Sequence, residues 1–213
     1  MKLNERNIVQ TLMGQLENKY VRILAGKYPS NSARIKSFLS KQFSYLPSLR
    51  PEIDMLFVDR SGQVNAAEVK FFKKTEMSFK MPFYKGIDQA LSLYRYGFDN
   101  VALWHFFAPD ILMDEINSYG AEAWYFIRNS LQLKLNFSYF KIIDETTALK
   151  FQVMQYRDRH RGFSLGKFVD DPQFLIVWRY GNPLLLTGDQ FTLKIREALI
   201  EFYLGGLQQA DKR

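Results

Sequence analysis

Two carboxylates and a lysine form the clearest candidate reactive group in this sequence: Asp54 and, fourteen residues later, Glu68 followed by Lys70. Two like charges held close together repel, and a divalent cation offsets that repulsion. Mg²⁺ takes oxygen ligands in octahedral geometry and keeps several waters, so two carboxylates and a strand carbonyl, here that of Val69, would suit it. A lysine beside such an ion can hold a water and offset negative charge on a phosphate. These residues indicate attack of water on a phosphodiester, with Mg²⁺ as cofactor and Mn²⁺ as its substitute.

A β-hairpin would bring these side chains together. Two apolar runs within residues 53–72 flank a turn that ends in Gly62. A three-residue turn of this kind requires glycine at its last, left-handed position. The turn sets the register, so that Asp54 lies directly opposite Glu68, with Cβ atoms roughly 4.5 to 5.5 Å apart. Strand alternation then puts Lys70 on the same face as Glu68.

Apolar periodicity along the rest of the chain predicts an α/β fold. The order helix, hairpin, helix, strand, helix, strand predicts a central mixed β-sheet flanked by helices. No repeat or linker divides the chain, which predicts a single domain over 1–213, with a core over 1–143 and a C-terminal extension over 144–213. The expected helices cover about 3–25, 35–39, 84–96, 111–119 and 192–204, and the expected strands cover 53–58, 64–72, 100–107, 123–127, 151–156 and 174–180.

Composition excludes several classes of protein. The chain has no Cys and two His, which excludes a disulfide framework and zinc sites built from thiolates. The net charge is +7, and residues 1–50 hold nine Lys or Arg against two acids, an imbalance that suits a polyanion such as nucleic acid. No apolar run has the ~20 residues of a membrane span or the form of a signal peptide, so we expect no membrane association and a cytoplasmic location.

The residues around the candidate group resemble a known family. The run 52–58, the turn with Gly62 and the run 66–70 resemble the PD-(D/E)xK nuclease superfamily. The resemblance covers about residues 1–130. It implies a restriction endonuclease-like core, in which the candidate side chains share one face of the hairpin.

The family's functional residues carry over position by position. The resemblance implies that Asp54 and Glu68 are metal ligands, together with the carbonyl of Val69, and that Lys70 positions the nucleophilic water. Gln89, in the helix that follows, matches a glutamine that touches DNA or the metal's water in many members. In the RecB-like branch a tyrosine follows that glutamine by four residues, whereas here Tyr94 follows by five.

A third acidic residue is less firmly placed. Family members often add a glutamate from the first helix, and Glu5 is preferred because it shares the helix's apolar stripe, whereas Glu17 lies about 100° off that stripe. The family's Pro-Asp step is absent, because Pro51 is followed by Glu52. Glu52 lies on the same strand face as Asp54, and it is the second choice to replace or supplement it.

The resemblance implies a metal-dependent DNA nuclease that leaves a 5′-phosphate and a 3′-hydroxyl. The compact chain and its opening Asn4-Glu5-Arg6 are most similar to Holliday junction resolvases of archaeal or viral type. A resolvase makes paired cuts, which would require a symmetric homodimer, and a viral protein would act in the host cytoplasm. The alternative is a catalytically inactive nucleic-acid-binding protein with a nuclease-like fold. Endonuclease and exonuclease action both stay open.

Overall fold

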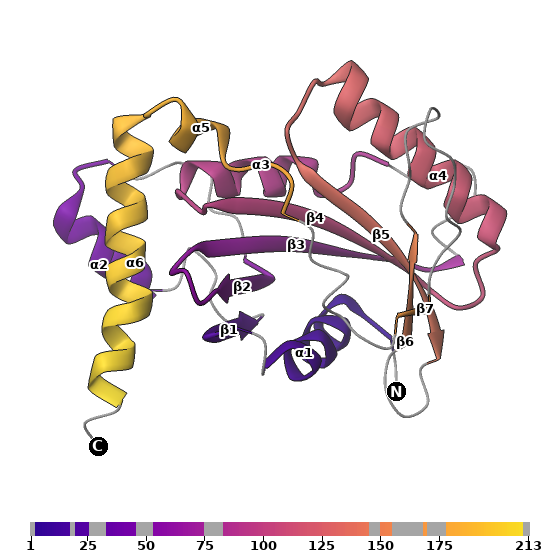
Figure 1. The fold of residues 1–213 in the computed structure, drawn as a ribbon, viewed down its shortest axis with the longest axis horizontal. Coiled ribbons are helices and arrows are strands. Elements are labelled where there is room, and N and C mark those ends of the chain that lie inside the picture. Colours follow the sequence, from indigo (N-terminus) through magenta and orange to yellow (C-terminus); the bar gives the residue numbers. More distant parts are fainter. Residues whose placement is uncertain are drawn as a thin grey trace.

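A computed structural model describes residues 3–17, 20–25, 33–45, 53–74, 83–144, 150–154, 168–169 and 178–210 of the chain. Within these residues, seven strands form one sheet in chain order, from β1 at one edge to β7 at the other (Figure 1). The strands are β1 (Arg22–Ala25), β2 (Met55–Val58), β3 (Val64–Phe72), β4 (Asn100–Phe107), β5 (Asn136–Asp144), β6 (Lys150–Met154) and β7 (Phe168–Val169). The helices are α1 (Glu5–Leu16), α2 (Ala33–Gln42), α3 (Ile87–Arg95), α4 (Met113–Tyr125), α5 (Pro183–Leu186) and α6 (Gln190–Ala210).

The sheet is mixed, as the sequence predicts. The central strand β4 runs parallel to β3 on one side and to β5 on the other. The outer neighbours β1–β2, β2–β3, β5–β6 and β6–β7 pair antiparallel. The predicted α/β class, with a central mixed sheet flanked by helices, is therefore confirmed.

The hairpin of β2 and β3 has the predicted register. Met55 pairs with Ala67, which makes residue 68 the next position opposite residue 54. The turn closes with a hydrogen bond of 3.1 Å from the N–H of Gly62 to the carbonyl of Asp59. Gly62 has a φ of +80°, the left-handed conformation that the predicted turn requires.

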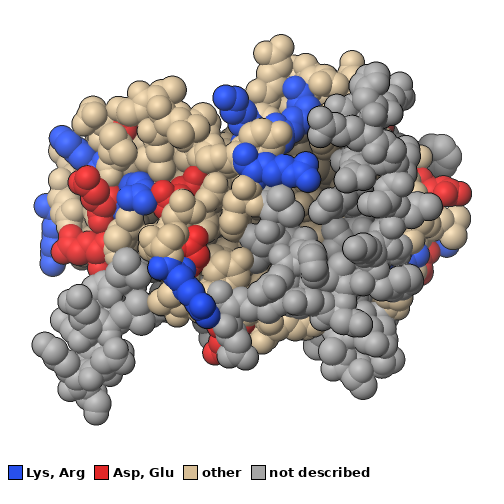
Figure 2. All heavy atoms as spheres, in the orientation of Figure 1, with Lys and Arg blue, Asp and Glu red and all other residues tan. Residues whose placement is uncertain are grey.

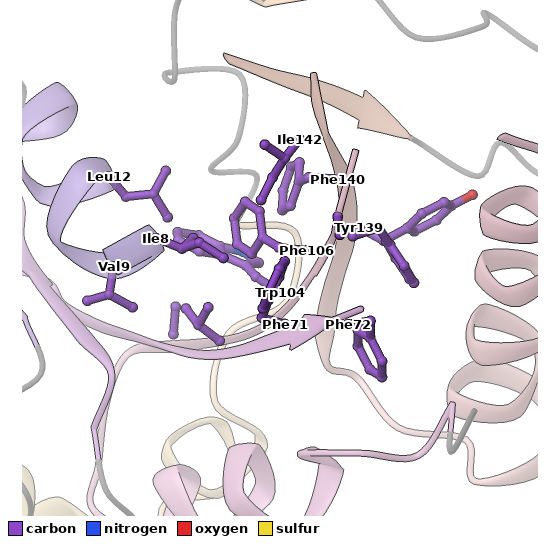
Figure 3. Close-up of a cluster of buried hydrophobic side chains, with 14 of the residues drawn as sticks. Ile8, Val9, Leu12, Phe71, Phe72, Trp104, Phe106, Tyr139, Phe140 and Ile142 are labelled. Atoms are coloured by element: carbon purple, nitrogen blue, oxygen red, sulfur yellow. The ribbon is translucent and has the colours of Figure 1, made fainter. Parts of the chain in front are cut away.

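Helices cover both faces of the sheet. Helix α1 packs its apolar stripe against one face, where Ile8 and Leu12 lie against the aromatic rings of Trp104 and Phe106 (Figure 3). Helices α3 and α4 lie on the opposite side of the sheet (Figure 1). Helix α6 joins α2 and α3 in a second apolar cluster, to which Ile195 contributes a fully buried side chain. The sheet is thus enclosed around β3 and β4, the strands nearest the candidate group.

Two predicted elements were wrong in the first 130 residues. The first helix ends at Leu16, and residues 22–25 form the edge strand β1, because they pair with β2. The expected strand over 123–127 lies instead at the end of α4 and in the π-helical turn Phe126–Ser130. A short buried apolar run does not distinguish helix from strand by periodicity alone. On the side of β4 away from β3, the neighbouring strand is β5, which the sequence analysis did not predict.

The C-terminal segment continues the same sheet. Strand β6 confirms most of the strand expected over 151–156, and α6 contains the helix expected over 192–204. The strand expected over 174–180 is wrong for residues 178–180, which are not in a strand, and its remainder lies outside the described residues. No helix among the described residues is long and apolar enough to cross a membrane.

Candidate active site

The site lies at the edge of β3 where, among the described residues, no strand pairs with positions 68–72 on the β2 side. Strand β2 pairs with residues 64–67 of β3, so residues 68–72 extend beyond it on that side. Alternate residues of a strand turn their backbone polar groups to the same edge. At this edge the N–H of Val69 donates to Asp54 Oδ2 over 2.7 Å, and the N–H of Phe71 donates to Glu5 Oε1 over 3.1 Å. Two carboxylates from other elements therefore accept hydrogen bonds from the backbone of β3 beyond its pairing with β2.

Asp54 and Glu5 reach this edge for different local reasons. Asp54 precedes the first residue of β2 and is placed there by the hairpin register. Glu5 is the first residue of α1, where the N-cap Asn4 accepts a 2.8 Å hydrogen bond from the N–H of Asn7 and fixes the start of the helix. The apolar stripe of α1 packs on the sheet, which turns Glu5 toward β3. The helix and the hairpin together bring the predicted carboxylates to one strand.

Glu68 and Lys70 form a buried hydrogen-bonded pair on the face of β3 that α3 covers. Lys70 Nζ lies 2.5 Å from Glu68 Oε1, and the side chains are only 9% and 1% exposed. Their neighbours on β4 are His105, opposite Lys70, and Leu103, opposite Glu68. A buried carboxyl group and a buried ammonium group are costly unless each has a close partner. The 2.5 Å contact provides such a partner for each of them.

One oxygen of this pair lacks a hydrogen-bond partner among the residues that the structure describes. Glu68 Oε2 is buried and accepts no hydrogen bond from any of the described residues. Burial, and then the negative charges of Asp54 and Glu5, raise the pKa of Glu68 to about 8, although Lys70 acts in the opposite direction. Such an oxygen in an acidic neighbourhood is suited to a cation.

The pKa of Lys70 is also raised. Burial disfavours the charged form of Lys70, but the neighbouring Glu68 carboxylate, with Glu5 and Asp54 behind it, outweighs that effect and raises the pKa of Lys70. Lys70 therefore remains a cation beside three acidic residues. A fixed positive charge at this position can oppose charge that develops on a phosphate.

The start of α3 packs directly on Lys70. Gly86, which precedes the helix, has a φ of +84°, and a Cβ atom there would lie 2.9 Å from Lys70 Cε and 2.9 Å from Leu103 Cδ1. Gly86 therefore leaves room for the lysine stem. Gln89 is half-buried in the first turn of α3. In the described part of the chain no hydrogen bond joins its side chain to Asp54 or Lys70, so its predicted role stays a prediction.

A histidine anchors the turn that carries Gly86. His105 is fully buried, and its Nε2 lies 3.0 Å from the carbonyl of Lys85, while its Nδ1 lies 2.8 Å from the hydroxyl of Tyr119. A carbonyl only accepts, so Nε2 carries the proton and Nδ1 accepts from Tyr119. Burial lowers the pKa of His105 to about 3, which keeps the ring neutral. Sequence reasoning missed Gly86 and Tyr119, although a glycine directly before a helix is a signal for a special backbone conformation.

The structure distinguishes the other acidic candidates, Glu5 and Glu17, by where their side chains lie. Glu5 is half-buried at the site, whereas Glu17, one residue past the end of α1, is exposed. Glu52 lies outside the described residues. As the side chains stand, no three Asp, Glu or His side chains of the described residues are gathered as ligands of one ion.

Surface charge is unevenly distributed on the visible face. Figure 2 shows Lys and Arg side chains without acidic neighbours in the upper middle of the view, over α3 and β5, whereas both signs are interspersed over α2 and α6. Near the candidate site, Lys85 Nζ lies 5.1 Å from the centre of the Phe72 ring and Lys73 Nζ lies 5.9 Å from that of Phe71. Two cations therefore lie over the aromatic rings at the end of β3.

No protein-family model matches the sequence, and no curated protein matches it. The fold defines an α/β protein with a mixed sheet, a class that hosts many activities. A functional assignment therefore depends on the chemistry of the site itself.

Proposed function

We propose that this protein is a Mg²⁺-dependent DNA nuclease of the PD-(D/E)xK type, which hydrolyses phosphodiester bonds by attack of water. One observation carries the proposal: Asp54 and Glu5 accept hydrogen bonds from the β3 backbone at Val69 and Phe71, the residues next to Lys70 in its buried pair with Glu68. Two carboxylates and a lysine at such an edge match the requirements of metal-assisted phosphodiester hydrolysis.

The residues present fit a hard cation. Asp54, Glu68 and the Val69 carbonyl would hold it, and Glu5 would complete the acidic environment. Glu68 Oε2 supports this fit, because it is buried and no described residue donates a hydrogen bond to it, which is costly for a carboxylate oxygen. The N–H of Val69 faces Asp54, and the carbonyl of the same strand residue turns to the same edge. When bound, Mg²⁺ supplies Lewis-acid stabilisation of negative charge on oxygen, and Mn²⁺ can replace it.

Lys70 has two tasks in this proposal. It donates a hydrogen bond directly to Glu68 Oε1, so a water bound by its other N–H groups would lie beside that carboxyl group and be oriented for attack. Its ammonium charge also opposes the negative charge that develops on the phosphate. Gly86 and the α3 turn confine the lysine stem and so restrict where the ammonium group lies.

The expected reaction leaves a 5′-phosphate and a 3′-hydroxyl. Lys73 and Lys85, whose ammonium groups lie over the rings of Phe71 and Phe72 at the end of β3, would contact the phosphate backbone. A junction resolvase-like substrate, paired cuts by a homodimer and action in the cytoplasm are the finer parts of the proposal.

The proposal is tested by incubating the protein with Mg²⁺ and labelled linear, single-stranded, flapped and four-way-junction DNAs. We expect cleavage of at least one substrate, and a loss of about 10²-fold or more in Asp54→Asn, because the amide removes a ligand charge but keeps an oxygen for the Val69 N–H. Asp110→Asn is the matched control, since Asp110 is exposed. Absence of cleavage by the wild type, or equal rates in Asp54→Asn, contradicts the nuclease. Binding without cleavage would favour an inactive nucleic-acid-binding protein.

A further inference from the structure

An exposed aromatic ring lies beside the proposed active site. Tyr84 is 59% exposed, in the turn 83–86 that leads into α3. The turn is closed by a 3.1 Å hydrogen bond from the N–H of Ile87 to the carbonyl of Tyr84. Gly86, two residues further on, packs against the stem of Lys70. Two residues span at most about 7 Å, so Tyr84 is held close to the proposed point of cleavage.

The turn that carries this ring is anchored on two sides. The ring of Phe83 packs edge-on against that of Tyr84, with centroids 5.6 Å apart, and against that of Phe126, with centroids 4.9 Å apart. On the other side of Tyr84, the carbonyl of Lys85 accepts the hydrogen bond from His105 Nε2. The backbone on both sides of Tyr84 is therefore fixed, while more than half of the residue's surface remains exposed to solvent.

We propose that Tyr84 stacks on an unpaired nucleobase of the DNA strand whose phosphate lies at Lys70. The inference rests on the proposed nuclease and names its substrate class: DNA that is single-stranded or unpaired next to the scissile phosphate. An aromatic ring beside a cationic path along the backbone is the common arrangement of single-strand binding sites. Lys85 follows Tyr84 directly and provides such a cation. A base stacked inside a paired duplex offers no open face to the ring.

Tyr45 provides a matched control. It is 61% exposed, and its ring lies 6.0 Å from that of Phe191. Arg95, the last residue of α3, covers the same Phe191 ring at 5.4 Å. Nine helical residues separate that end of α3 from Gly86, which is about 13 Å. Tyr45 is thus an equally exposed tyrosine at the other end of the helix.

Stacking is measured directly with an oligodeoxythymidine of about 16 nucleotides that carries one 2-aminopurine at successive positions. A chelator in the buffer prevents hydrolysis. We expect the fluorescence of 2-aminopurine to fall at one position on binding to the wild type. Tyr84→Ala should abolish that change and weaken binding at least about fivefold, whereas Tyr84→Phe and Tyr45→Ala should retain both.

An abasic nucleotide tests the contact without changing the protein. Placed at the responsive position, it should weaken wild-type binding by the same factor as Tyr84→Ala and should weaken that variant no further. Equal penalties at all positions, or an unchanged fluorescence response in Tyr84→Ala, would overturn the inference. These measurements do not require cleavage. If the protein shows the stacking signal but cuts no DNA, the proposed nuclease activity is rejected and the stacking of Tyr84 is retained. If the wild type and Tyr84→Ala cleave blunt duplex DNA at equal rates, the stacking of Tyr84 is rejected and the nuclease activity is retained.

Discussion

Asp54 Oδ2 accepts a 2.7 Å hydrogen bond from the backbone N–H of Val69, the residue between Glu68 and Lys70. Asp54 precedes β2, yet it continues the hairpin's register beyond the last strand pair, Met55 with Ala67. The carboxylate is therefore placed by the same turn that aligns the two strands. The relative position of Asp54 and Glu68 does not depend on a separate loop.

Replacing Lys70 by Met should lower the cleavage rate by about 10²- to 10³-fold, because the variant keeps the length of the side chain but loses the charge that opposes phosphate. DNA affinity in a chelating buffer should change little. Single-turnover cleavage assays and fluorescence anisotropy measure the two effects separately. Lys194→Met, at an exposed position of α6, is the control. Unchanged cleavage in Lys70→Met would remove the lysine from the mechanism.

Glu5 and Glu17 should differ in their effect on metal binding. Glu5→Gln keeps an oxygen for the N–H of Phe71 but removes a negative charge from the site, so we expect Mn²⁺ affinity to fall about 10- to 100-fold. Glu17→Gln changes an exposed residue and should leave the affinity as it is. Titration calorimetry with Mn²⁺ measures both. Indistinguishable isotherms for the wild type and Glu5→Gln would exclude Glu5 from the site.

The raised pKa of Glu68 predicts a pH dependence of stability. The folded protein keeps a proton on Glu68 up to about pH 8, whereas the unfolded chain releases it near the ordinary value of 4.5. The folded state therefore binds more protons within this window, and the free energy of unfolding should fall as pH rises through it. Binding of Mn²⁺ needs the carboxylate form, so its affinity should rise with pH until about 8.

Thermal unfolding of the wild type and Glu68→Gln at several pH values between about 5 and 9 tests this dependence. The amide still offers an acceptor to Lys70 but does not titrate, so the variant should lack this part of the slope. His105 contributes equally to both proteins, and its contribution cancels in the difference. Parallel stability curves for the two proteins would show that Glu68 titrates normally.

The hairpin turn should be sensitive at one glycine. Gly62→Ala gives a Cβ atom to a residue whose φ is +80°, a conformation that residues with a side chain rarely adopt. The variant should lose about 1–2 kcal/mol in the free energy of unfolding, although nothing lies within 4 Å of the new atom. Gly14→Ala, within helix α1 and equally uncrowded, should instead gain about 0.5–1 kcal/mol. Denaturant unfolding measures both changes. A gain in stability for Gly62→Ala would contradict the proposed role of the turn.

The local features of the candidate site were predictable from the sequence. Turn chemistry at Gly62 and strand alternation are short-range effects, so the register that places Asp54 opposite Glu68 followed from them. Strand β4 was predicted with its observed ends, Asn100 and Phe107, because a long apolar run of β-formers is a strong signal. The same short-range reasoning failed for residues 22–25, where pairing with β2 overrides helical periodicity.

The sequence by itself therefore determined the hairpin and its register, because these depend on neighbours a few positions away. Only the tertiary structure decided that Glu5 meets the N–H of Phe71, which is 66 residues distant, and that the turn before α3 packs on Lys70. These contacts depend on how α1 and α3 pack on the two faces of the sheet. Burial completes the site in the same way: the raised pKa of Glu68 arises from the surrounding helices and strands.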